Sequence, residues 1–392
     1  MTGTGADRQN RWFSRSVESL ILSCGSREQN RPAIAALLDC IDRQVPIHAR
    51  QESMVVIAAA RECGPLLLCQ SSGSTGRAKT IRRGHASWIA SFEVNRSLFG
   101  LGSHDCYAVL GHLGHSLSLY AVTEAVHLGA NVLALGGDGP RRQVEAIRVG
   151  KASVLYATPA QIRLLCRAGA ARLDRIRHVI CGGGLLAPGE REEFAAFFPN
   201  ALIYEFYGAA ETSFISISGP DTPTGSVGRP YPDVDLRLGN TGEIWLRSPY
   251  LFDGYDGEGS VDTRWRDGFL TVGEIGWLDG AGNLVLRGRK SRMVTVADVN
   301  VFLEDIERIM AGICGARSCA AVSVRDRMRG NAVIGFVEGG SDGLTAELIL
   351  TKCRDALGPL STPRRIEFLG QMPMLPSGKP DLLALQRFAE ET

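Results

Sequence analysis

One stretch constrains the fold of this chain more than any other. An apolar run at residues 66–69 leads into a loop rich in serine, threonine and glycine, and a lysine follows at position 79. Small residues let backbone N–H groups approach an anion, hydroxyl groups add donors, and a lysine adds positive charge. The stretch therefore predicts a strand followed by a phosphate-binding loop, with a plain flexible turn as the alternative. The expected phosphate contacts are Ser71, Ser72, Gly73, Ser74, Thr75, Gly76 and Lys79.

The spacing within this loop differs from that of P-loop nucleotide-binding proteins. Those proteins place four residues between the first glycine and a Gly-Lys-Ser/Thr sequence. Here Gly76 stands three positions after Gly73, and Lys79 stands three positions after Gly76. The spacing therefore argues against a P-loop kinase.

Length and charge narrow the classes of protein to be considered. The chain has 392 residues, of which 44% are hydrophobic and 22% charged, and its formal net charge is +1. This composition is typical of a globular protein with two or three domains. Near-zero net charge gives no electrostatic reason to bind nucleic acid or an anionic membrane. No apolar run approaches the roughly 18 residues of a membrane-spanning helix, so we expect no membrane span.

The cysteines and the N-terminus predict the cellular compartment. Ten cysteines occur singly, without a Cys-x-x-Cys pair, and the seven histidines do not join them at metal-ligand spacing. The first residues are polar and carry no signal-peptide pattern. We therefore expect a cytoplasmic protein with reduced thiols.

The apolar patterns predict an α/β fold. Short buried-strand patterns alternate with helical ones from residue 85 to residue 204, which favours layered helices around a largely parallel sheet. Residues 31–41 and 53–60 also read as helical pieces.

From residue 225 the pattern changes to short strands between glycine, proline and aspartate turns, which predicts a small antiparallel sheet or barrel. The charged residues 287–291 mark the expected boundary. The predicted domains are 1–288, with a small β subdomain at about 225–287, a hinge at 289–291, and an α+β domain at 292–392.

Five segments, in order along residues 65–385, resemble the motifs of the adenylate-forming (AMP-binding) superfamily. This superfamily includes acyl-CoA synthetases, aryl-acid ligases and adenylation domains. The phosphate-binding loop is the first of the five. The resemblance implies a large N-terminal α/β domain and a small mobile C-terminal domain, with ATP between them. The segment before the loop is shorter here than in the family, which implies a shortened N-terminal subdomain.

The second motif, Tyr207-Gly208-Ala209-Ala210-Glu211, resembles Tyr-Gly-x-Thr-Glu. By that resemblance Tyr207 and Gly208 lie against the adenine, and Glu211 binds the Mg²⁺ that accompanies ATP. A flat ring and a carboxylate on a turn suit these tasks. Ala210 replaces the usual threonine and removes one hydroxyl contact to the α-phosphate. The alternative is a core tyrosine and a solvated acid.

Besides these five motifs, two shorter segments resemble parts of the pocket for the acid and the adenine. Residues 181–185 carry three consecutive glycines, and Gly183 and Gly184 would let the backbone approach the adenine. His115 stands where acyl-activating and aryl-acid-activating members carry a histidine near the acid. A strand-to-helix turn and a core histidine are the respective alternatives.

Residues 268–279 resemble Gly-Trp-x-x-Thr-Gly-Asp-x-Gly-x-x-Asp, with Glu274 in place of the aspartate that binds the ribose hydroxyls. Either acid can accept from two vicinal hydroxyls, although Glu274 carries one more methylene. Arg289 matches the arginine that also reaches ribose or phosphate. A surface acid and a surface base are the alternatives.

The last two motifs lie in the predicted C-terminal domain. In residues 290–307, Ala297 and Asp298 replace a Gly-Gly pair of the loop that faces the pantetheine tunnel in CoA-forming members. Residues 373–381 resemble Pro-x-x-x-Ser-Gly-Lys-x-Asp. By that resemblance Lys379 bridges the substrate carboxylate and the α-phosphate, where negative charge builds up.

The resemblance implies ATP-dependent activation of a carboxylic acid as acyl-AMP, with Mg²⁺, followed by transfer to CoA. Lys379, Glu211 and His115 are the expected catalytic residues. One alternative is a ligase that loads the phosphopantetheine of a carrier protein, which the altered 297–298 loop favours. Another is a weakened nucleotide-binding relative that acts through a protein partner, which Ala210 and Glu274 favour. An apolar or aromatic acid is the expected substrate.

Overall fold

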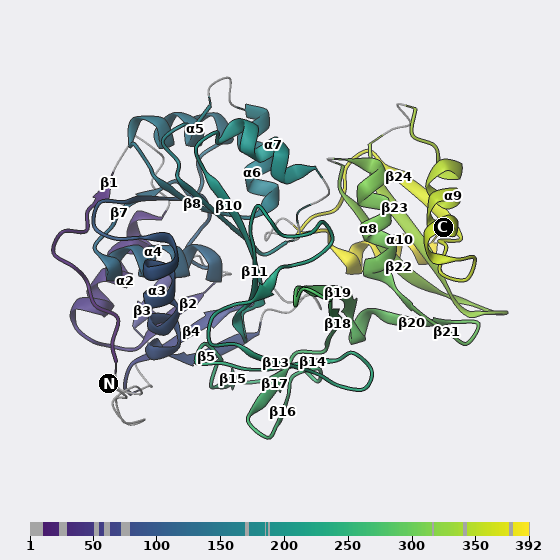
Figure 1. Cartoon of the computed structure of the whole chain (residues 1–392), viewed down its shortest axis with the longest axis horizontal. Coiled ribbons are helices and arrows are strands. Elements are labelled where there is room, and N and C mark those ends of the chain that lie inside the picture. Colours follow the sequence, from purple (N-terminus) through teal and green to yellow (C-terminus); the bar gives the residue numbers. More distant parts are fainter. Residues whose placement is uncertain are drawn as a thin grey trace. The chain divides into compact units, whose positions relative to one another are not determined.

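The computed structural model describes residues 11–22, 30–50, 55–58, 63–71, 79–168, 172–184, 186, 189–315, 317–339, 343–375 and 379–391 (Figure 1). Its residues form two compact units. The first takes its described residues from Met1–Ser72, Ala78–Asp235 and Leu246–Gly259, and the second takes them from Leu236–Trp245 and Ser260–Thr392. The mixture of helices and sheets confirms the predicted α/β class.

The first unit contains an eight-stranded sheet in the order β1-β7-β6-β8-β9-β10-β11-β12. The strands from β1 to β10 are parallel, as expected, whereas β11 and β12 run antiparallel to their neighbours. The strands are β1 (Ile21–Leu22), β6 (Cys106–Val109), β7 (Asn131–Ala134), β8 (Val154–Ala157), β9 (His178–Gly182), β10 (Leu202–Ala209), β11 (Ser213–Ser218) and β12 (Arg229–Pro230).

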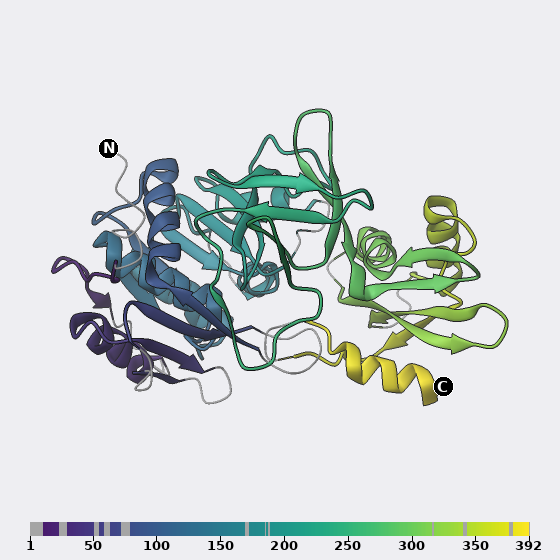
Figure 2. The same ribbon diagram turned by 90° about the horizontal axis from the view of Figure 1, so that it is seen from below.

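Helices cover both faces of this sheet (Figures 1 and 2). One face carries α4 (Ser116–Leu128), which packs on α3 (His85–Phe99). The other carries α5 (Pro140–Val149), α6 (Pro159–Ala168) and α7 (Glu190–Phe197). The strand residues alternate between the two layers. Ala108 and Leu155 join the core beneath α5, α6 and α7, and the Tyr107 and Tyr156 rings stack on the opposite face.

A five-stranded sheet completes the first unit, in the order β15-β5-β4-β2-β3. Its strands are β2 (Ile47–Arg50), β3 (Val55–Ala58), β4 (Leu66–Gln70), β5 (Thr80–Gly84) and β15 (Gly254–Asp256). The helix α2 (Arg31–Asp42) forms where it was predicted.

The prediction of a helix over 53–60 was wrong. Residues 55–58 form β3, which pairs antiparallel with β2, and the rest of that range lies outside the described residues. A continuous apolar run such as residues 54–60 has no spacing that separates a helix from a strand, and the pairing with β2 makes residues 55–58 a strand.

The second unit consists of small sheets and three helices among its described residues. The helices are α8 (Leu303–Cys314), α9 (Ala346–Leu357) and α10 (Leu382–Glu391). The sheets are β13 (Asp235–Leu238), β14 (Ile244–Arg247), β17 (Phe269–Thr271) and β16 (Arg264–Arg266); β18 (Glu274–Leu278) and β19 (Leu284–Arg289); β20 (Met293–Val296) and β21 (Val299–Phe302); and β22 (Cys319–Asp326), β23 (Gly330–Glu338) and β24 (Arg365–Leu369). The short strands from β13 onward match the predicted change of pattern.

A short 3₁₀ helix, Lys290–Arg292, separates β19 from β20. It contains most of the predicted hinge, which stays a prediction because the structure holds a single arrangement. No helix in the described part of the chain is both long and apolar enough to cross a bilayer.

Candidate active site

The predicted phosphate-binding loop connects two strands of a hairpin. β4 pairs antiparallel with β5 from Leu66 opposite Gly84 to Gln70 opposite Thr80. At the open end, the Ser71 N–H donates to the Lys79 carbonyl over 2.9 Å, so the loop begins and ends at a closed hairpin. Residues 72–78 lie outside the described residues, and the predicted contacts of Ser72, Gly73, Ser74, Thr75 and Gly76 stay predictions.

Glu211 lies on the tight turn that joins β10 to β11. Its Oε1 accepts a hydrogen bond of 2.7 Å from the Tyr255 hydroxyl on β15, and its carbonyl accepts from the Phe252 N–H. β15 in turn pairs with β5, with Tyr255 opposite Ile81. The turn is therefore bound to the sheet that carries the phosphate-binding loop.

Gly208 and Thr212 explain the shape of this turn. A Cβ on Gly208 would lie 1.7 Å from the Ser213 carbonyl oxygen, so only glycine fits there. Thr212 is fully buried, and its Oγ1 accepts from the Ala209 N–H over 2.9 Å. The Thr212 hydroxyl therefore holds the turn together. Tyr207 precedes a bulge in β10 and is half-buried.

Sequence reasoning missed Arg83, which follows the phosphate-binding loop on β5. Its guanidinium is buried and donates to the Ala210 carbonyl and, over 2.7 Å, to the Ser213 hydroxyl. The signal was present, because strand alternation puts Arg83 on the same face as the buried Ile81. Tyr255 was also missed, because its partner Glu211 lies 44 positions away in the sequence.

Gly183 and Gly184 follow β9, and both are exposed. Gly183 has a φ of +80°, a conformation that favours glycine. Shortly after them, the Leu186 N–H donates to Glu205 Oε1 over 2.8 Å. Glu205 lies on β10, and burial raises its pKa to about 7 against the opposing effects of the Leu186 N–H and Arg191. A buried carboxyl group that sequence reasoning missed thus anchors the glycine-rich segment.

His115 lies at the N-terminus of α4, in the loop after β6, and is half-buried. Its N–H donates to the His112 carbonyl over 3.0 Å. Burial lowers the pKa of His115, and the nearby His112 lowers it further, so the imidazole is neutral at neutral pH. A neutral imidazole can donate one hydrogen bond and accept another.

Three of the predicted segments meet at one edge of the main sheet. β6, β8, β9 and β10 are parallel neighbours, and His115, Gly183 and Glu211 all follow the carboxyl ends of these strands. Ligands of α/β proteins bind at this edge.

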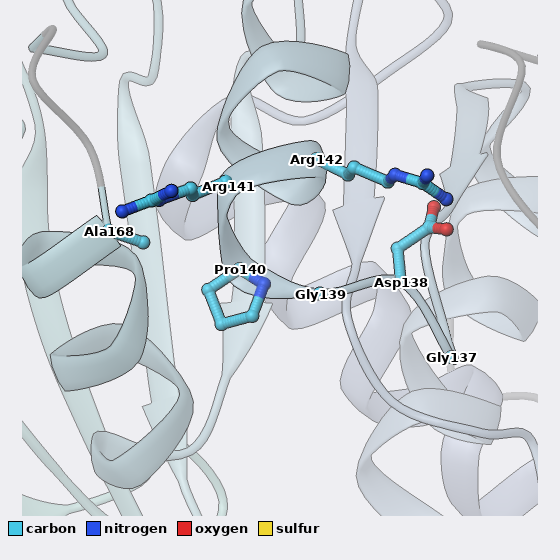
Figure 3. Close-up of a pocket in the computed structure, with 7 residues that line it drawn as sticks. All are labelled: Gly137, Asp138, Gly139, Pro140, Arg141, Arg142 and Ala168. Atoms are coloured by element: carbon cyan, nitrogen blue, oxygen red, sulfur yellow. The ribbon is translucent and has the colours of Figure 1, made fainter.

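A hollow of about 550 Å³ lies between Gly137, Asp138, Gly139, Pro140, Arg141, Arg142 and Ala168. Figure 3 shows the Asp138 and Arg142 side chains pointing toward one another there. This hollow contains none of the residues predicted for the site.

Glu274 and Arg289 face each other across the ribbon of β18 and β19 in the second unit. Arg289 Nε donates to Glu274 Oε1 over 2.8 Å, and Glu274 is 6% exposed. The Arg289 N–H also lies 3.3 Å from Glu304 Oε1 on α8. Residues that are 15 positions apart are thus brought together, and their binding of ribose stays a prediction.

Lys379 lies within electrostatic reach of the same pair. Its residue is exposed overall, but burial of the ammonium lowers the pKa of Lys379, Arg289 lowers it further, and Glu274 opposes both. The chain holds Lys379 there through the Leu375 N–H, which donates to its carbonyl over 2.8 Å. Asp381, two residues later, accepts from the N–H groups of Leu383 and Ala384 and caps α10. Residues 376–378 lie outside the described part.

Ala297 and Asp298 form the two-residue connection between β20 and β21. Their φ angles are +46° and +67°, so both adopt the left-handed conformation that glycine favours. Replacement of the Gly-Gly pair therefore does not prevent positive φ angles in this turn.

Comparison with known proteins decides the family. The model of the AMP-binding enzyme family matches residues 24–256, and the model of the AMP-binding enzyme C-terminal domain matches residues 305–379. The chain belongs to the AMP-binding enzyme family. The resemblance that the sequence motifs indicated is thereby confirmed.

Relatives of this AMP-binding enzyme include CoA ligases. It is 28% identical over 341 residues to the uncharacterized acyl–CoA ligase YhfT of Bacillus subtilis (strain 168), covering 84% of this chain and 69% of the relative. It is 24% identical over 337 residues to 2-succinylbenzoate–CoA ligase of Enterococcus faecalis, covering 82% of this chain and 68% of the relative. The chain thus spans about two thirds of the length of these relatives.

Solved structures of similar fold include two enzymes with different products. The amide bond synthetase McbA of Marinactinospora thermotolerans matches with a TM-score of 0.73 at 26% identity, covering 82% of this chain and 68% of that one. The o-succinylbenzoate CoA synthetase of Bacillus subtilis, bound to an acyl-adenylate, matches with a TM-score of 0.72 at 20% identity, covering 81% and 68%. This AMP-binding enzyme is accordingly an adenylate-forming ligase.

The residues present fit the Mg²⁺ and ATP that the family uses. Mg²⁺ prefers one or two carboxylate oxygens together with phosphate oxygens and water. Glu211 offers a half-buried carboxylate that accepts from a neutral hydroxyl, and the described residues supply no cation that pairs with it. The described residues also contain no cluster of three or more acidic, histidine or cysteine side chains that could hold a metal ion alone. A shared Mg²⁺, held by Glu211 and by phosphate, is therefore the arrangement that fits.

Proposed function

We propose that this enzyme activates a carboxylic acid as an acyl-adenylate and then passes the acyl group to the thiol of CoA. The observation that carries the proposal is the grouping of Lys379 with Glu274 and Arg289. Lys379 comes 90 positions after Arg289 and 105 positions after Glu274 in the sequence, and each would have a distinct task in the reaction.

The first step is attack of a carboxylate oxygen on the α-phosphorus of ATP, which forms a C–O–P linkage and releases pyrophosphate. Lys79, the loop before it and Glu211 would hold the phosphates and Mg²⁺, and Mg²⁺ neutralises charge on the leaving pyrophosphate. Tyr207 would lie against the adenine, and Glu274 would accept from the ribose hydroxyls. Lys379 would donate to the carboxylate and to the α-phosphate, where negative charge increases in the transition state.

The second step is attack of a thiol on the acyl-adenylate, which forms a thioester and releases AMP. We propose that the chain turns at residues 289–291 between the steps, so that Lys379 leaves and the 297–298 turn takes part. The φ of +46° at Ala297 supports a functional role for that turn, because the left-handed conformation is unfavourable for alanine.

The carboxylic acid would bind at the edge of the main sheet, near His115 and Gly183. Small and apolar residues line this edge, and Leu117 Cδ1 would lie 3.6 Å from a Cβ placed on Gly182. We therefore propose an apolar or aromatic acid. A neutral His115 would suit a hydrogen bond to it without adding charge.

The test is acid-dependent exchange of pyrophosphate into ATP, over fatty, aryl and amino acids, followed by thioester formation with CoA. The proposal expects exchange with fatty or aryl acids and a thioester that requires CoA. Exchange without CoA turnover would indicate a different acceptor for the acyl group. That acceptor would be the phosphopantetheine of a carrier protein, or an amine if the product is an amide. ATP binding without exchange for any acid would indicate the weakened relative that acts through a protein partner.

A further inference from the structure

Arg83 is a charged side chain in an unusual environment. It is 1% exposed, and burying a guanidinium away from water is costly unless its donors are satisfied. No carboxylate forms an ion pair with it among the residues that the structure describes. Instead its two terminal nitrogens meet part of this requirement and donate to oxygen atoms of Ser87 over 3.2 Å, of Ser213 over 2.7 Å and of Tyr250 over 3.2 Å, and also to the Ala210 carbonyl.

These partners belong to three separate segments of the first unit. Ala210 and Ser213 lie on either side of Glu211 and Thr212, on the turn between β10 and β11. Tyr250 lies on the segment that leads to β15, and the Ser213 hydroxyl also donates to its carbonyl over 3.2 Å. Arg83 itself lies on β5, four positions after Lys79. One guanidinium thus joins the strand that leaves the phosphate-binding loop to both ends of the Glu211 turn.

The turn itself needs support from outside. Ser213 has a φ of +55°, a left-handed conformation that is unfavourable for residues other than glycine, asparagine and aspartate. The Arg83 hydrogen bond to Ser213 Oγ gives this conformation a fixed partner. The neighbouring Phe252 N–H and Tyr255 hydroxyl hold Glu211 itself, so the carboxylate and its backbone are fixed from both sides.

We propose that Arg83 is a positioning residue that fixes the Glu211 turn for the Mg²⁺ of bound MgATP. The proposal rests on the proposed function, because Glu211 is the Mg²⁺ ligand only if the enzyme uses MgATP. Arg83 touches neither metal nor substrate. It acts through the Ala210 carbonyl and the Ser213 hydroxyl, and its buried positive charge lies within electrostatic reach of Glu211.

The main variant is Arg83→Lys, which keeps the charge but not the planar fork that reaches several oxygens at once. Arg83→Met removes both. We expect the Mg²⁺ concentration for half-maximal pyrophosphate exchange to rise about tenfold in Arg83→Lys and more in Arg83→Met, since tenfold corresponds to the loss of one charged hydrogen bond. The half-saturating concentration of the carboxylic acid should stay unchanged in both.

Arg191, on α7, provides a matched control. It binds the other end of the hairpin that β10 and β11 form. Its guanidinium also bonds one backbone carbonyl, that of Ile203, and one serine hydroxyl, that of Ser218 over 2.8 Å. Arg191→Lys should lower the melting temperature by a similar amount and leave the Mg²⁺ dependence unchanged. Equal Mg²⁺ shifts in the two lysine variants would show that Arg83 acts only as a general brace of the core, and would overturn the proposal.

Ser213→Gly keeps the proposal testable if the Arg83 variants fail to fold. Glycine accepts the φ of +55° without strain, so this variant folds but lacks the hydroxyl that Arg83 binds. We expect its Mg²⁺ requirement to rise about threefold, which corresponds to one weakened hydrogen bond. An unchanged Mg²⁺ requirement in Ser213→Gly, or a change in the acid requirement alone, contradicts the proposal.

Equilibrium dialysis of ATP with and without Mg²⁺ separates this proposal from the proposed function. Suppose that the wild-type protein binds ATP more tightly with Mg²⁺ but exchanges no pyrophosphate with any acid. The proposed reaction is then wrong, but ATP binding still measures whether Arg83 positions Glu211. In that case Arg83→Lys must lose the Mg²⁺-dependent part of the ATP affinity. A wild-type protein whose ATP binding ignores Mg²⁺ overturns the role of Arg83.

Discussion

Glu211 and Glu274 are both acids at the end of an antiparallel ribbon, but their partners differ. Glu211 accepts a hydrogen bond from the neutral Tyr255 hydroxyl, and Glu274 forms an ion pair with Arg289. A carboxylate whose partner is neutral keeps its charge available for a cation, whereas an ion-paired carboxylate is better suited to accept hydrogen bonds from hydroxyl groups. We infer that the environment, rather than the residue type, suits one of these acids to a metal ion and the other to ribose hydroxyls. Four predictions test it, beginning with the largest expected effect.

Lys379→Ala tests the cation that lies beside the Glu274–Arg289 pair. We expect acid-dependent pyrophosphate exchange to fall at least about a hundredfold, because one donor to a developing negative charge is removed. ATP affinity, measured by equilibrium dialysis, should change little. Lys352→Ala on α9 is the control, since Lys352 is exposed and belongs to no predicted motif. Comparable loss in both variants would remove Lys379 from the proposed mechanism.

Glu211→Gln removes the charge while keeping the size of the side chain. The Mg²⁺ concentration for half-maximal exchange should rise about thirtyfold, because a neutral amide oxygen is a weaker ligand for a hard cation. The Tyr255 hydroxyl can still donate to the amide oxygen, so the fold should be retained. An unchanged Mg²⁺ requirement would mean that another group holds the metal. It would contradict the proposed difference in role between Glu211 and Glu274.

Glu274→Gln should act on ATP binding and on pH dependence, and leave the Mg²⁺ requirement unchanged. We expect the half-saturating ATP concentration to rise about tenfold, which corresponds to the removal of one charged hydrogen bond.

The sign of the pH effect follows from Lys379. Glu274 raises the pKa of Lys379 against the effects of burial and Arg289, so its removal lowers that pKa further. The protonated form of Lys379 is then lost at lower pH, and the alkaline decline of the exchange rate should move to lower pH. Glu211→Gln should leave this decline in place, and a common shift in both variants would contradict the assignment.

Tyr255→Phe is the smallest test, because it removes only the hydroxyl next to Glu211. We expect the Mg²⁺ requirement to rise about threefold and the stability to fall by about 1 kcal/mol, the usual net value of one hydrogen bond. Urea unfolding measures the second value. Phe252 is already packed edge-to-face against the Tyr255 ring, so the aromatic contact should survive the substitution.

Much of the fold was predictable because its signals are local. Alternation of strands and helices indicated the parallel sheet, and the apolar run before the phosphate-binding loop became β4. The helix expected over 53–60 was wrong because β3 depends on a pairing with β2 that no local pattern records. A short, continuous apolar run fits a helix and a buried strand equally well, so its periodicity could not identify the strand.

The candidate site was predictable where motifs carry the chemistry, and not where distant segments meet. Glu274, Arg289 and Lys379 were all named from the sequence, and the structure brings them together. Arg83 and Tyr255 were missed, because their partners lie 127 and 44 positions away. Nothing in a strand of alternating residues shows which remote carbonyl an arginine will meet, and only the assembled sheets reveal it.

The pairing of β15 with β5 has a consequence for synthesis of the chain. β5 is complete at Gly84, but β15, the strand that covers its free edge, ends at Asp256. Tyr250, whose carbonyl Arg83 binds, comes 167 positions after Arg83. While the ribosome is still making the intervening residues, β5 exposes unpaired N–H and C=O groups, together with an arginine that has yet to meet its partners. The nascent protein therefore passes through a long interval in which its nucleotide-binding half is open to mispairing. Chaperone dependence and aggregation of stalled chains should be greatest for those that end before β15.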